Sequence, residues 1–435
     1  MRTIYSYLLL SLVVIVITSC NKNNTPIIEK LNKINGVKIT ALEKFDTTLF
    51  KSAYEIMIDQ PYDHNDISKG NFKQRVLIFH SGNYSKPIVM ETHGYNIWSD
   101  KETELCRLIK CNNLTVEHRF FGDSRPDSIP WKYLTIKQAA ADHHRIIQIF
   151  KKIYNGKWIT TGISKGGQTA IFHRTLYPND VDISIPYVAP VNYSREDKRI
   201  HNFINNIPGT KEDRQKIKDF QIAMFKNKAK LIPLLKKYAQ KKNYTFKMGF
   251  ERALELNILE YSFAFWQWGN SSVDKIPSVN TTPEKMFKHL IRVSSFSFFE
   301  DKRVEVQRPF YYQALTEMGM YSYEIKPFKK FLKDTTDVTF DFTAPKGVSV
   351  KFRPELTQMA KKFVETTDKQ MMYIYGEYDT WSATSAQISE NNKNSIKMVL
   401  PKGHHGTRIR HFKDKQKEKI YKTLETWLNQ KIERK

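Results

Sequence analysis

A serine lies in the middle of the glycine-rich stretch TGISKGGQTA at 161–170, where Ser164 has the spacing G-x-S-x-G. The stretch follows an apolar run at 157–162 and leads into a helical pattern at 166–178. Strand, sharp turn and helix in this order present a serine hydroxyl at the edge of a sheet, and the flanking glycines keep the strand and helix backbones from clashing. The pattern predicts that Ser164 is a nucleophile, the alternative being an ordinary loop serine.

A nucleophilic serine needs a histidine that takes its proton and a carboxylate that orients the histidine. In the strand–turn–helix arrangement these groups come later in the chain, acid before histidine. Asp379 follows the apolar run MMYIYG and is the predicted acid, with Glu377 as the alternative. His405 lies in the glycine-bounded loop after the run SIKMVL and is the predicted base, with His404 as the alternative.

Two donors should stabilise the negative charge that develops on the attacked carbonyl oxygen. One is the backbone N–H of Lys165, directly after the serine. The other is expected in the loop after the run PIVMET, where His93 and Gly94 precede Tyr95, and we assign it to the N–H of Tyr95. The alternative is that this loop is only a tight turn. This chemistry needs neither a metal nor an organic cofactor, and none is expected.

Such groups must be held by a sheet, and the chain supplies the strands. Short runs rich in β-branched residues alternate with helical patterns. The predicted strands are 74–80, 87–92, 114–121, 157–162, 183–189, 371–376 and 395–400. Helices are predicted at 134–155 with Thr135 as N-cap, at 166–178, and from about residue 414 to the C-terminus. The alternation predicts an α/β fold whose mostly parallel sheet has helices on both faces.

The chain divides into segments of different character. Residues 1–20 have the pattern of a lipoprotein signal peptide, and 21–36 are polar enough to form a tether. Segments 37–191 and 365–435 carry the strand pattern and are predicted to form the α/β domain. Segment 192–364 is lysine-rich and helical in pattern, without regular strand spacing, and is predicted to form a helical cap inserted in that domain.

The N-terminal pattern predicts export. Arg2 precedes an apolar run at 8–17 that is too short for a membrane-spanning helix, and small residues then lead to Cys20. This is typical of a bacterial lipoprotein, in which Cys20 is lipidated and anchors the protein to the outer membrane, in the periplasm or at the cell surface. The alternative is a plain signal peptide. Cys106 and Cys111 are predicted to form a disulfide or to remain free thiols.

The net charge of +25 would suit nucleic acid or an anionic surface. The basic residues are spread along the chain without a nucleic-acid-binding motif, so a basic surface facing an anionic envelope is expected, with no nucleic acid as partner.

Several stretches resemble a known family of serine peptidases. EHRFFGDSRP at 117–126 resembles a segment of prolylcarboxypeptidase and dipeptidyl peptidase relatives. The serine stretch, IKQAAADHHRI at 136–146, FAFWQWG at 263–269 and the loop GHHGTRI at 403–409 resemble the secreted bacterial prolyl tripeptidyl aminopeptidases. The resemblance implies an α/β-hydrolase with a helical cap. It also implies an exopeptidase that releases short peptides, often tripeptides and commonly after proline, from free N-termini.

An aminopeptidase must bind a cationic α-amine, which calls for a carboxylate at a set distance from the serine. Glu117 is the candidate, the alternative being a structural ion pair with Arg119 or Arg174. Trp266 and Trp268 are candidates for an apolar pocket for proline, the alternative being cap core.

We therefore expect an exported serine exopeptidase acting on peptide substrates. The alternatives are a carboxylesterase or lipase with the same triad, and a non-catalytic surface-binding lipoprotein.

Overall fold

The structure is a computed structural model that describes residues 25–99, 101–335 and 338–434. The predicted signal segment and Cys20 lie outside these residues. The predicted tether contains a short helix, α1 (Ile27–Leu31). Its two terminal side chains, Ile27 and Leu31, are buried in an apolar cluster on one face of the sheet. The part of the tether that forms this helix is therefore packed rather than extended. No helix within the described ranges is both long and apolar enough to cross a membrane.

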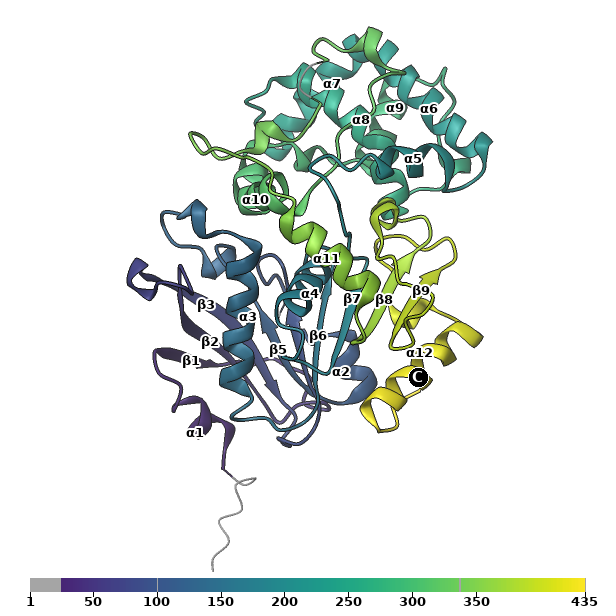
Figure 1. The fold of residues 1–435 in the computed structure, drawn as a ribbon. Coiled ribbons are helices and arrows are strands. Elements are labelled where there is room, and N and C mark those ends of the chain that lie inside the picture. Colours follow the sequence, from purple (N-terminus) through teal and green to yellow (C-terminus); the bar gives the residue numbers. More distant parts are fainter. Residues whose placement is uncertain (1–24, 100, 336–337, 435) are drawn as a thin grey trace, which may run out of the picture.

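A sheet of nine strands runs through the described chain in the order β1-β2-β3-β5-β4-β6-β7-β8-β9 (Figure 1). The strands are β1 (Val37–Ala41), β2 (Ser52–Pro61), β3 (Asn71–His80), β4 (Ile88–Thr92), β5 (Asn112–Val116), β6 (Trp158–Ile163), β7 (Ile183–Tyr187), β8 (Gln370–Gly376) and β9 (Ser395–Leu400). From β5 to β9 neighbouring strands are parallel, whereas β1, β2 and β3 pair antiparallel. All seven predicted strands are present, and β1 and β2 are additional.

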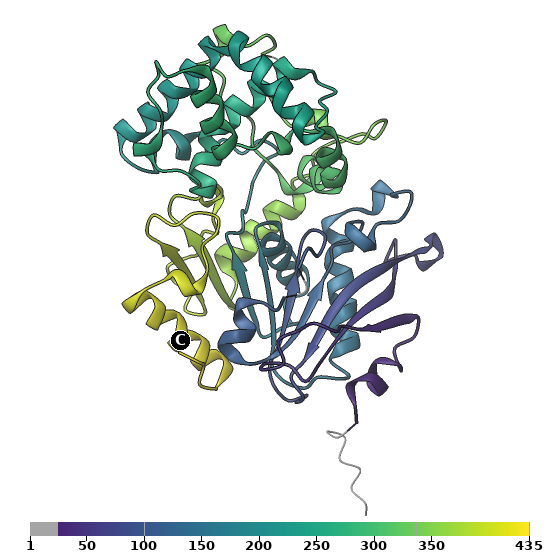
Figure 2. The same ribbon diagram turned by 180° about the vertical axis from the view of Figure 1, so that it is seen from behind.

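Helices cover both faces of the sheet, as the α/β prediction requires. Alternating side chains of β3 point to opposite faces, so that Val76 and Ile78 belong to one buried cluster and Leu77 and Phe79 to another. The first cluster packs against α3 (Ile136–Phe150), which begins after the N-cap Thr135 as predicted. The second packs against α2 (Glu104–Ile109) and α12 (Asp414–Leu428), which lie on the face seen in Figure 2. The chain therefore has the α/β-hydrolase fold.

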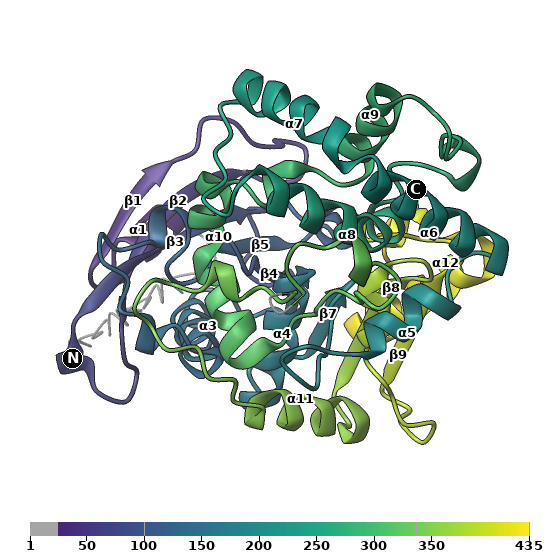
Figure 3. The same ribbon diagram turned by 90° about the horizontal axis from the view of Figure 1, so that it is seen from above.

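A helical cap lies between β7 and β8 in the sequence and over the carboxyl ends of the strands in space (Figures 1 and 3). Its helices are α5 (Arg199–Asn206), α6 (Lys211–Lys226), α7 (Lys228–Lys242), α8 (Phe250–Trp268), α9 (Pro283–Val293) and α10 (Asp301–Gln313). The chain returns to the sheet through α11 (Glu355–Thr366), which packs against α4 (Lys165–Leu176). The predicted end of the cap at residue 364 falls inside α11, so this helix belongs to the sheet layer and the cap ends before it.

Cap and sheet share one apolar cluster. Phe172 of α4 and Tyr373 of β8 belong to the same buried cluster as Leu254 and Phe263 of the cap helix α8. The cap is therefore joined to the sheet by packing as well as by its two chain connections.

Candidate active site

Ser164 occupies a strained turn between β6 and α4. Its φ is 57° and its ψ is −122°, a backbone conformation that non-glycine residues rarely adopt. Its N–H donates a 2.9 Å hydrogen bond to the carbonyl of Tyr187 on the adjacent strand. Strain of this kind persists only where the surrounding structure over-determines it, and it clusters at active sites.

The glycines around the serine permit close backbone contact, as the sequence pattern predicted. A Cβ added at Gly162 would lie 2.4 Å from the carbonyl carbon of Gly166. A Cβ at Gly94, which has a φ of +80°, would lie 2.5 Å from the N atom of Gly166. The loop after β4 therefore rests directly on the first turn of α4.

His405 and Asp379 are in contact. The Nδ1 atom of the His405 ring lies 2.8 Å from Oδ2 of Asp379, which is fully buried. The other oxygen, Oδ1, accepts the N–H of Trp381. With Nδ1 held by the carboxylate, Nε2 is the nitrogen of His405 left to exchange a proton with another group.

The two alternatives have other partners. His404 turns its ring toward the cap, where its Nδ1 lies 2.8 Å from the carbonyl of Trp266. Glu377 accepts the N–H of Lys402 at a solvent-exposed turn. Neither side chain joins the contact between Asp379 and His405.

Strand register places these groups at one edge of the sheet. Ile163, directly before the serine, is aligned with Tyr187 of β7, which is aligned with Ile374 of β8. Asp379 follows β8, and His405 follows β9 beyond it. Adjacent strands are about 4.8 Å apart, so the serine and acid turns are separated by about 10 Å across the sheet, a gap that a histidine side chain from the next loop can bridge.

The expected oxyanion donors lie on two loops that are tied together. Within the described part of the chain, the backbone N–H groups of Lys165 and Tyr95 make no hydrogen bond. The Lys165 side chain, only 2% exposed, donates from Nζ to the carbonyl of Gly94 at 2.5 Å. Burial lowers the pKa of the Lys165 amine well below its usual value. This tie was not apparent from the sequence, which gives no sign of where a lysine side chain points.

The Tyr95 side chain belongs to the same surroundings. Burial raises the pKa of its phenol, and the Ser164 side chain opposes the rise. Its ring lies near Phe121 and Phe310, with centroids 5.9 and 5.6 Å away. Burial lowers the pKa of nearby His93 to about 4, with a smaller contribution from Lys165, so this histidine is neutral at physiological pH.

The prediction that Glu117 binds the substrate amine is wrong. Its side chain is fully buried, and both carboxylate oxygens are already used. Oε1 accepts the N–H of Ile97 at 2.9 Å, and Oε2 accepts both the N–H and the hydroxyl of Ser124. The expected alternative, an ion pair with Arg119 or Arg174, is also wrong, because Glu117 is instead a structural acceptor for two loops.

The two candidate tryptophans have different surroundings. Trp268, which is 51% exposed, lies edge-on to the His405 ring with centroids 5.3 Å apart. Trp266 is buried and packs edge-on against Tyr378, and its ring fills the space next to Gly209 on the α5–α6 connection. Trp268 therefore borders the His405 loop, whereas Trp266 is part of the cap core.

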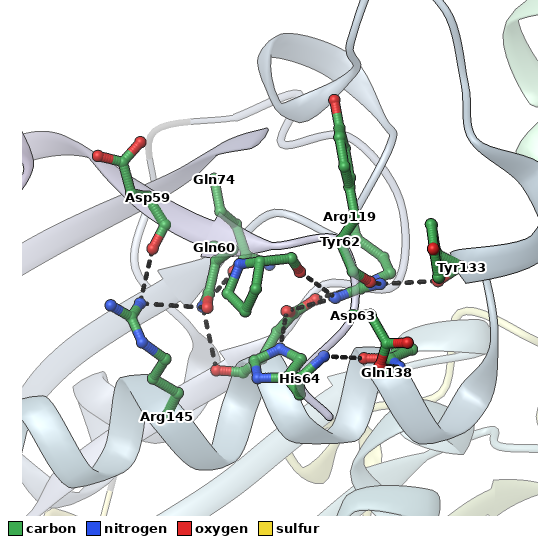
Figure 4. A network of polar contacts seen from close by, with 12 residues as sticks. Asp59, Gln60, Tyr62, Asp63, His64, Gln74, Arg119, Tyr133, Gln138 and Arg145 are labelled. Atoms are coloured by element: carbon green, nitrogen blue, oxygen red, sulfur yellow. Dashed lines mark hydrogen bonds and ion pairs between the residues drawn. The ribbon is translucent and has the colours of Figure 1, made fainter. Parts of the chain in front are cut away.

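A buried ion pair joins two of the sequence motifs (Figure 4). Arg119 donates from Nε and Nη2 to the two carboxylate oxygens of Asp142 on α3, each at 2.6 Å. His64 contacts the same carboxylate at 2.7 Å, and the Arg119 Nη1 donates to the carbonyls of Tyr62 and Tyr133. This network fixes the loop after β5 against α3 and was not foreseen from the sequence.

Cys106 and Cys111 are free and buried, with their Sγ atoms 3.0 Å apart. In the described ranges, no three histidine, cysteine, aspartate or glutamate side chains are grouped to hold a metal ion.

Comparison with known proteins places the chain among peptidases. The sequence model of the family described as PS-10 peptidase S37 matches residues 22–431. A prolyl tri/tetrapeptidyl aminopeptidase of Streptomyces mobaraensis is 30% identical over 357 residues, which is 80% of this chain and 74% of the relative. A lysosomal Pro-X carboxypeptidase of Bos taurus is 31% identical over 156 residues, 31% of either chain. The crystal structure of a Mycobacterium smegmatis proline iminopeptidase aligns with 86% of this chain and 97% of its own, at 12% identity and a TM-score of 0.40.

Proposed function

Because the chain belongs to the peptidase S37 family of serine peptidases, we propose that it releases tripeptides and similar short peptides from free N-termini, including after proline. Family membership confirms the resemblance seen in the sequence. The length of the released peptide and the residue before the cut follow from the relative's name and are part of the proposal.

The proposal assigns the chemistry to Ser164, His405 and Asp379, and the observation that carries it is the 2.8 Å contact between His405 and Asp379. The Ser164 oxygen attacks the scissile carbonyl while Nε2 of His405 takes its proton. Asp379 keeps the proton on Nδ1 and stabilises the imidazolium that forms. The leaving amine then takes the proton from Nε2, and water hydrolyses the acyl-enzyme by the same steps in reverse.

The oxyanion formed in each step is assigned to the backbone N–H groups of Lys165 and Tyr95, which make no other hydrogen bond among the described residues. Donors fixed in advance stabilise developing charge without reorganisation, which is the largest single contribution in many hydrolases. The tie from Lys165 Nζ to the Gly94 carbonyl supports this assignment, because it holds one donor loop against the other.

We also propose that the protein is exported and anchored through lipidated Cys20, on the evidence of the sequence pattern at 1–20. Fractionation of cells that express the protein tests this. Wild type is expected in the membrane fraction and Cys20→Ala outside it, and equal distribution of the two would reject the lipid anchor.

Product analysis by mass spectrometry tests the peptidase assignment. Matched peptides with free and N-acetylated termini are incubated with wild type and with Ser164→Ala. Wild type is expected to release short N-terminal fragments from the free peptide only, and the variant to release none. Cleavage of simple esters with both peptides left intact would show an esterase with the same triad, and no reaction with either would favour a non-catalytic protein.

A further inference from the structure

One buried carboxylate of the cap has no cation. Glu260 on α8 is 6% exposed, and its Oε2 accepts hydrogen bonds from the hydroxyls of Tyr321 and Tyr323 at 2.8 and 2.9 Å. Its Oε1 accepts no hydrogen bond from any described residue. This oxygen atom retains some solvent accessibility. No lysine, arginine or histidine of the described chain lies within ion-pair distance of Glu260.

Other buried acids of the cap have compensating partners. Glu255, on the same helix, forms an ion pair with Lys228 at 2.6 Å, and Glu317 forms one with Arg353 at 3.0 Å. Glu300 has no ion pair, but its carboxylate accepts two backbone N–H groups at the start of α10. Burying an unpaired carboxylate is unfavourable, so such a group in a cap over an active site is a candidate for binding a cation from outside. Burial raises the pKa of Glu260 to about 8, with the two tyrosine hydroxyls opposing the shift, and an ammonium group bound beside it would favour the charged form.

The helix that carries Glu260 ends at the catalytic edge. Gln267 follows Glu260 by seven residues and so lies on the same face of α8, about 10 Å farther along the axis. The Gln267 carbonyl accepts the N–H of His405 at 2.8 Å, and the next residue, Trp268, lies against the His405 ring. The Gln267 side chain makes no hydrogen bond with the described residues, which leaves its amide available to a bound peptide.

An aromatic cluster lies between the serine loop and Glu260. The Tyr95 ring lies 5.6 Å from the ring of Phe310, which lies 5.1 Å from that of Tyr311, measured between centroids. Burial raises the pKa of Tyr311, and Tyr95 and Glu260 both add to the rise.

The rise of about 10 Å along α8 from Glu260 to Gln267, whose carbonyl meets the His405 loop, is comparable with the length of a short peptide. An extended chain advances about 3.3 Å per residue, so three residues between the α-amine and the scissile carbonyl span about 10 Å. An ammonium group that hydrogen-bonds to a carboxylate makes a charge-assisted interaction that neutral donors do not match.

We propose that Glu260 binds the α-ammonium group of the substrate and that its position along α8 sets the cut after the third residue. The inference rests on the proposed function and identifies the substrate-binding residue that the function requires.

Calorimetric binding to the catalytically inactive Ser164→Ala protein tests the proposal without turnover. The ligands are a tripeptide amide with a free amine, the same amide N-acetylated, and the matching di- and tetrapeptide amides. Ser164→Ala is compared with Ser164→Ala carrying Glu260→Gln, which keeps an acceptor for both tyrosines. Glu255→Gln in the same background is the control for a buried acid on the same helix.

Glu260→Gln is expected to weaken binding of the free tripeptide by about 10- to 100-fold, the value of a hydrogen bond to a charged group. Binding of the acetylated peptide should be weak and unchanged, and Glu255→Gln should leave the preference for the free amine intact. An equal loss for both peptides, or no loss, would overturn the proposal. If Glu260→Gln fails to fold, free and acetylated tripeptides of equal affinity for the Ser164→Ala protein would overturn it as well.

These outcomes are separable from those of the product analysis. Amine-dependent binding with no peptide release by wild type would leave the Glu260 site standing and reject the peptidase assignment. Release of short peptides by wild type, with no effect of Glu260→Gln on binding, would support the peptidase assignment and reject the Glu260 site.

Discussion

The Lys165 Nζ donates to the Gly94 carbonyl from a side chain that is almost completely buried, and it thereby joins the turn after β6 to the loop after β4. The residue whose backbone N–H is assigned to the oxyanion thus uses its side chain to position the loop that carries Tyr95. Lys165 thus adds a hydrogen bond to the close backbone contact between Gly94 and Gly166 that already joins the two loops.

Lys165→Met should lower kcat about 10- to 100-fold and change KM little, because the tie positions a donor that acts on the transition state. Steady-state kinetics on a tripeptide anilide measure both constants. Lys397→Met is the control, since Lys397 is a partly buried lysine whose Nζ donates to Ser385. A rise in KM with unchanged kcat would show that the tie serves ground-state binding instead.

Asp379→Asn should reduce kcat by about 10⁴-fold with the fold retained, because an amide cannot hold the His405 proton on Nδ1. The same assay, together with circular dichroism, measures the effect. Glu377→Gln, at the exposed turn two residues earlier, should remain close to wild type. Equal losses in the two variants would reject Asp379 as the orienting acid.

The two adjacent histidines should differ sharply. His405→Ala should abolish peptide release, whereas His404→Ala should reduce it less than about 10-fold, the cost of one hydrogen bond to the Trp266 carbonyl. Labelling of Ser164 by a fluorophosphonate probe gives a second readout, expected to fail only in His405→Ala. The opposite pattern would make His404 the base.

Arg119→Met should destabilise the protein by about 3–5 kcal/mol, because it leaves the buried Asp142 carboxylate without its guanidinium. Urea denaturation measures the change in unfolding free energy. Arg125→Met is the matched control, since it breaks a partly exposed pair with Glu305 and should cost less than about 1 kcal/mol. Similar costs for both would mean that the network of Figure 4 contributes little to stability.

Glu260 should make stability fall as the pH rises. Its pKa is about 8 in the folded protein, above the ordinary value near 4.5, so the folded state holds a proton that the unfolded state has lost between these values. The groups that face it, Tyr321, Tyr323 and Tyr311, carry no positive charge to offset this. Glu260→Gln should therefore melt close to wild type at pH 5 and several degrees higher at pH 9. A melting-temperature difference that is the same at both pH values would contradict the linkage.

The parts of the fold that the sequence predicted are those with local signals. β4, β6, β7 and β8 are mostly buried runs, β9 is an apolar run that is partly buried, and the N-cap Thr135 marks the start of α3. β1 and β2 were missed because they pair antiparallel near one edge of the sheet and lack a continuous apolar run. β1 alternates partly buried and exposed residues, and β2 mixes buried apolar residues with partly buried ones such as Glu55 and Asp59.

The residues of the candidate site also divide into those with a local sequence signal and those without one. Ser164, Asp379 and His405 each follow a recognisable strand, and the structure brings the last two into contact. Glu117 was misjudged because its role depends on Ser124, whose position is set by the turn after Phe121. Glu260 has no local signal at all, since only the packing of α8 against the segment at 321–323 shows that it is buried and unpaired.

The apolar cluster that runs without a break from α4 and β8 into α8 also bears on how such a protein can change over generations. A cap with its own core could be exchanged between relatives as a module, leaving the nucleophile turn intact. Here Phe172 of α4 and Phe263 of α8 belong to one core. A substitution in the cap that changes which peptide is bound should therefore also change the stability of the sheet. A substitution that weakens the sheet should in turn shift the helix that carries Glu260. Substitutions in this shared core are therefore expected to change peptide selectivity and folding stability together.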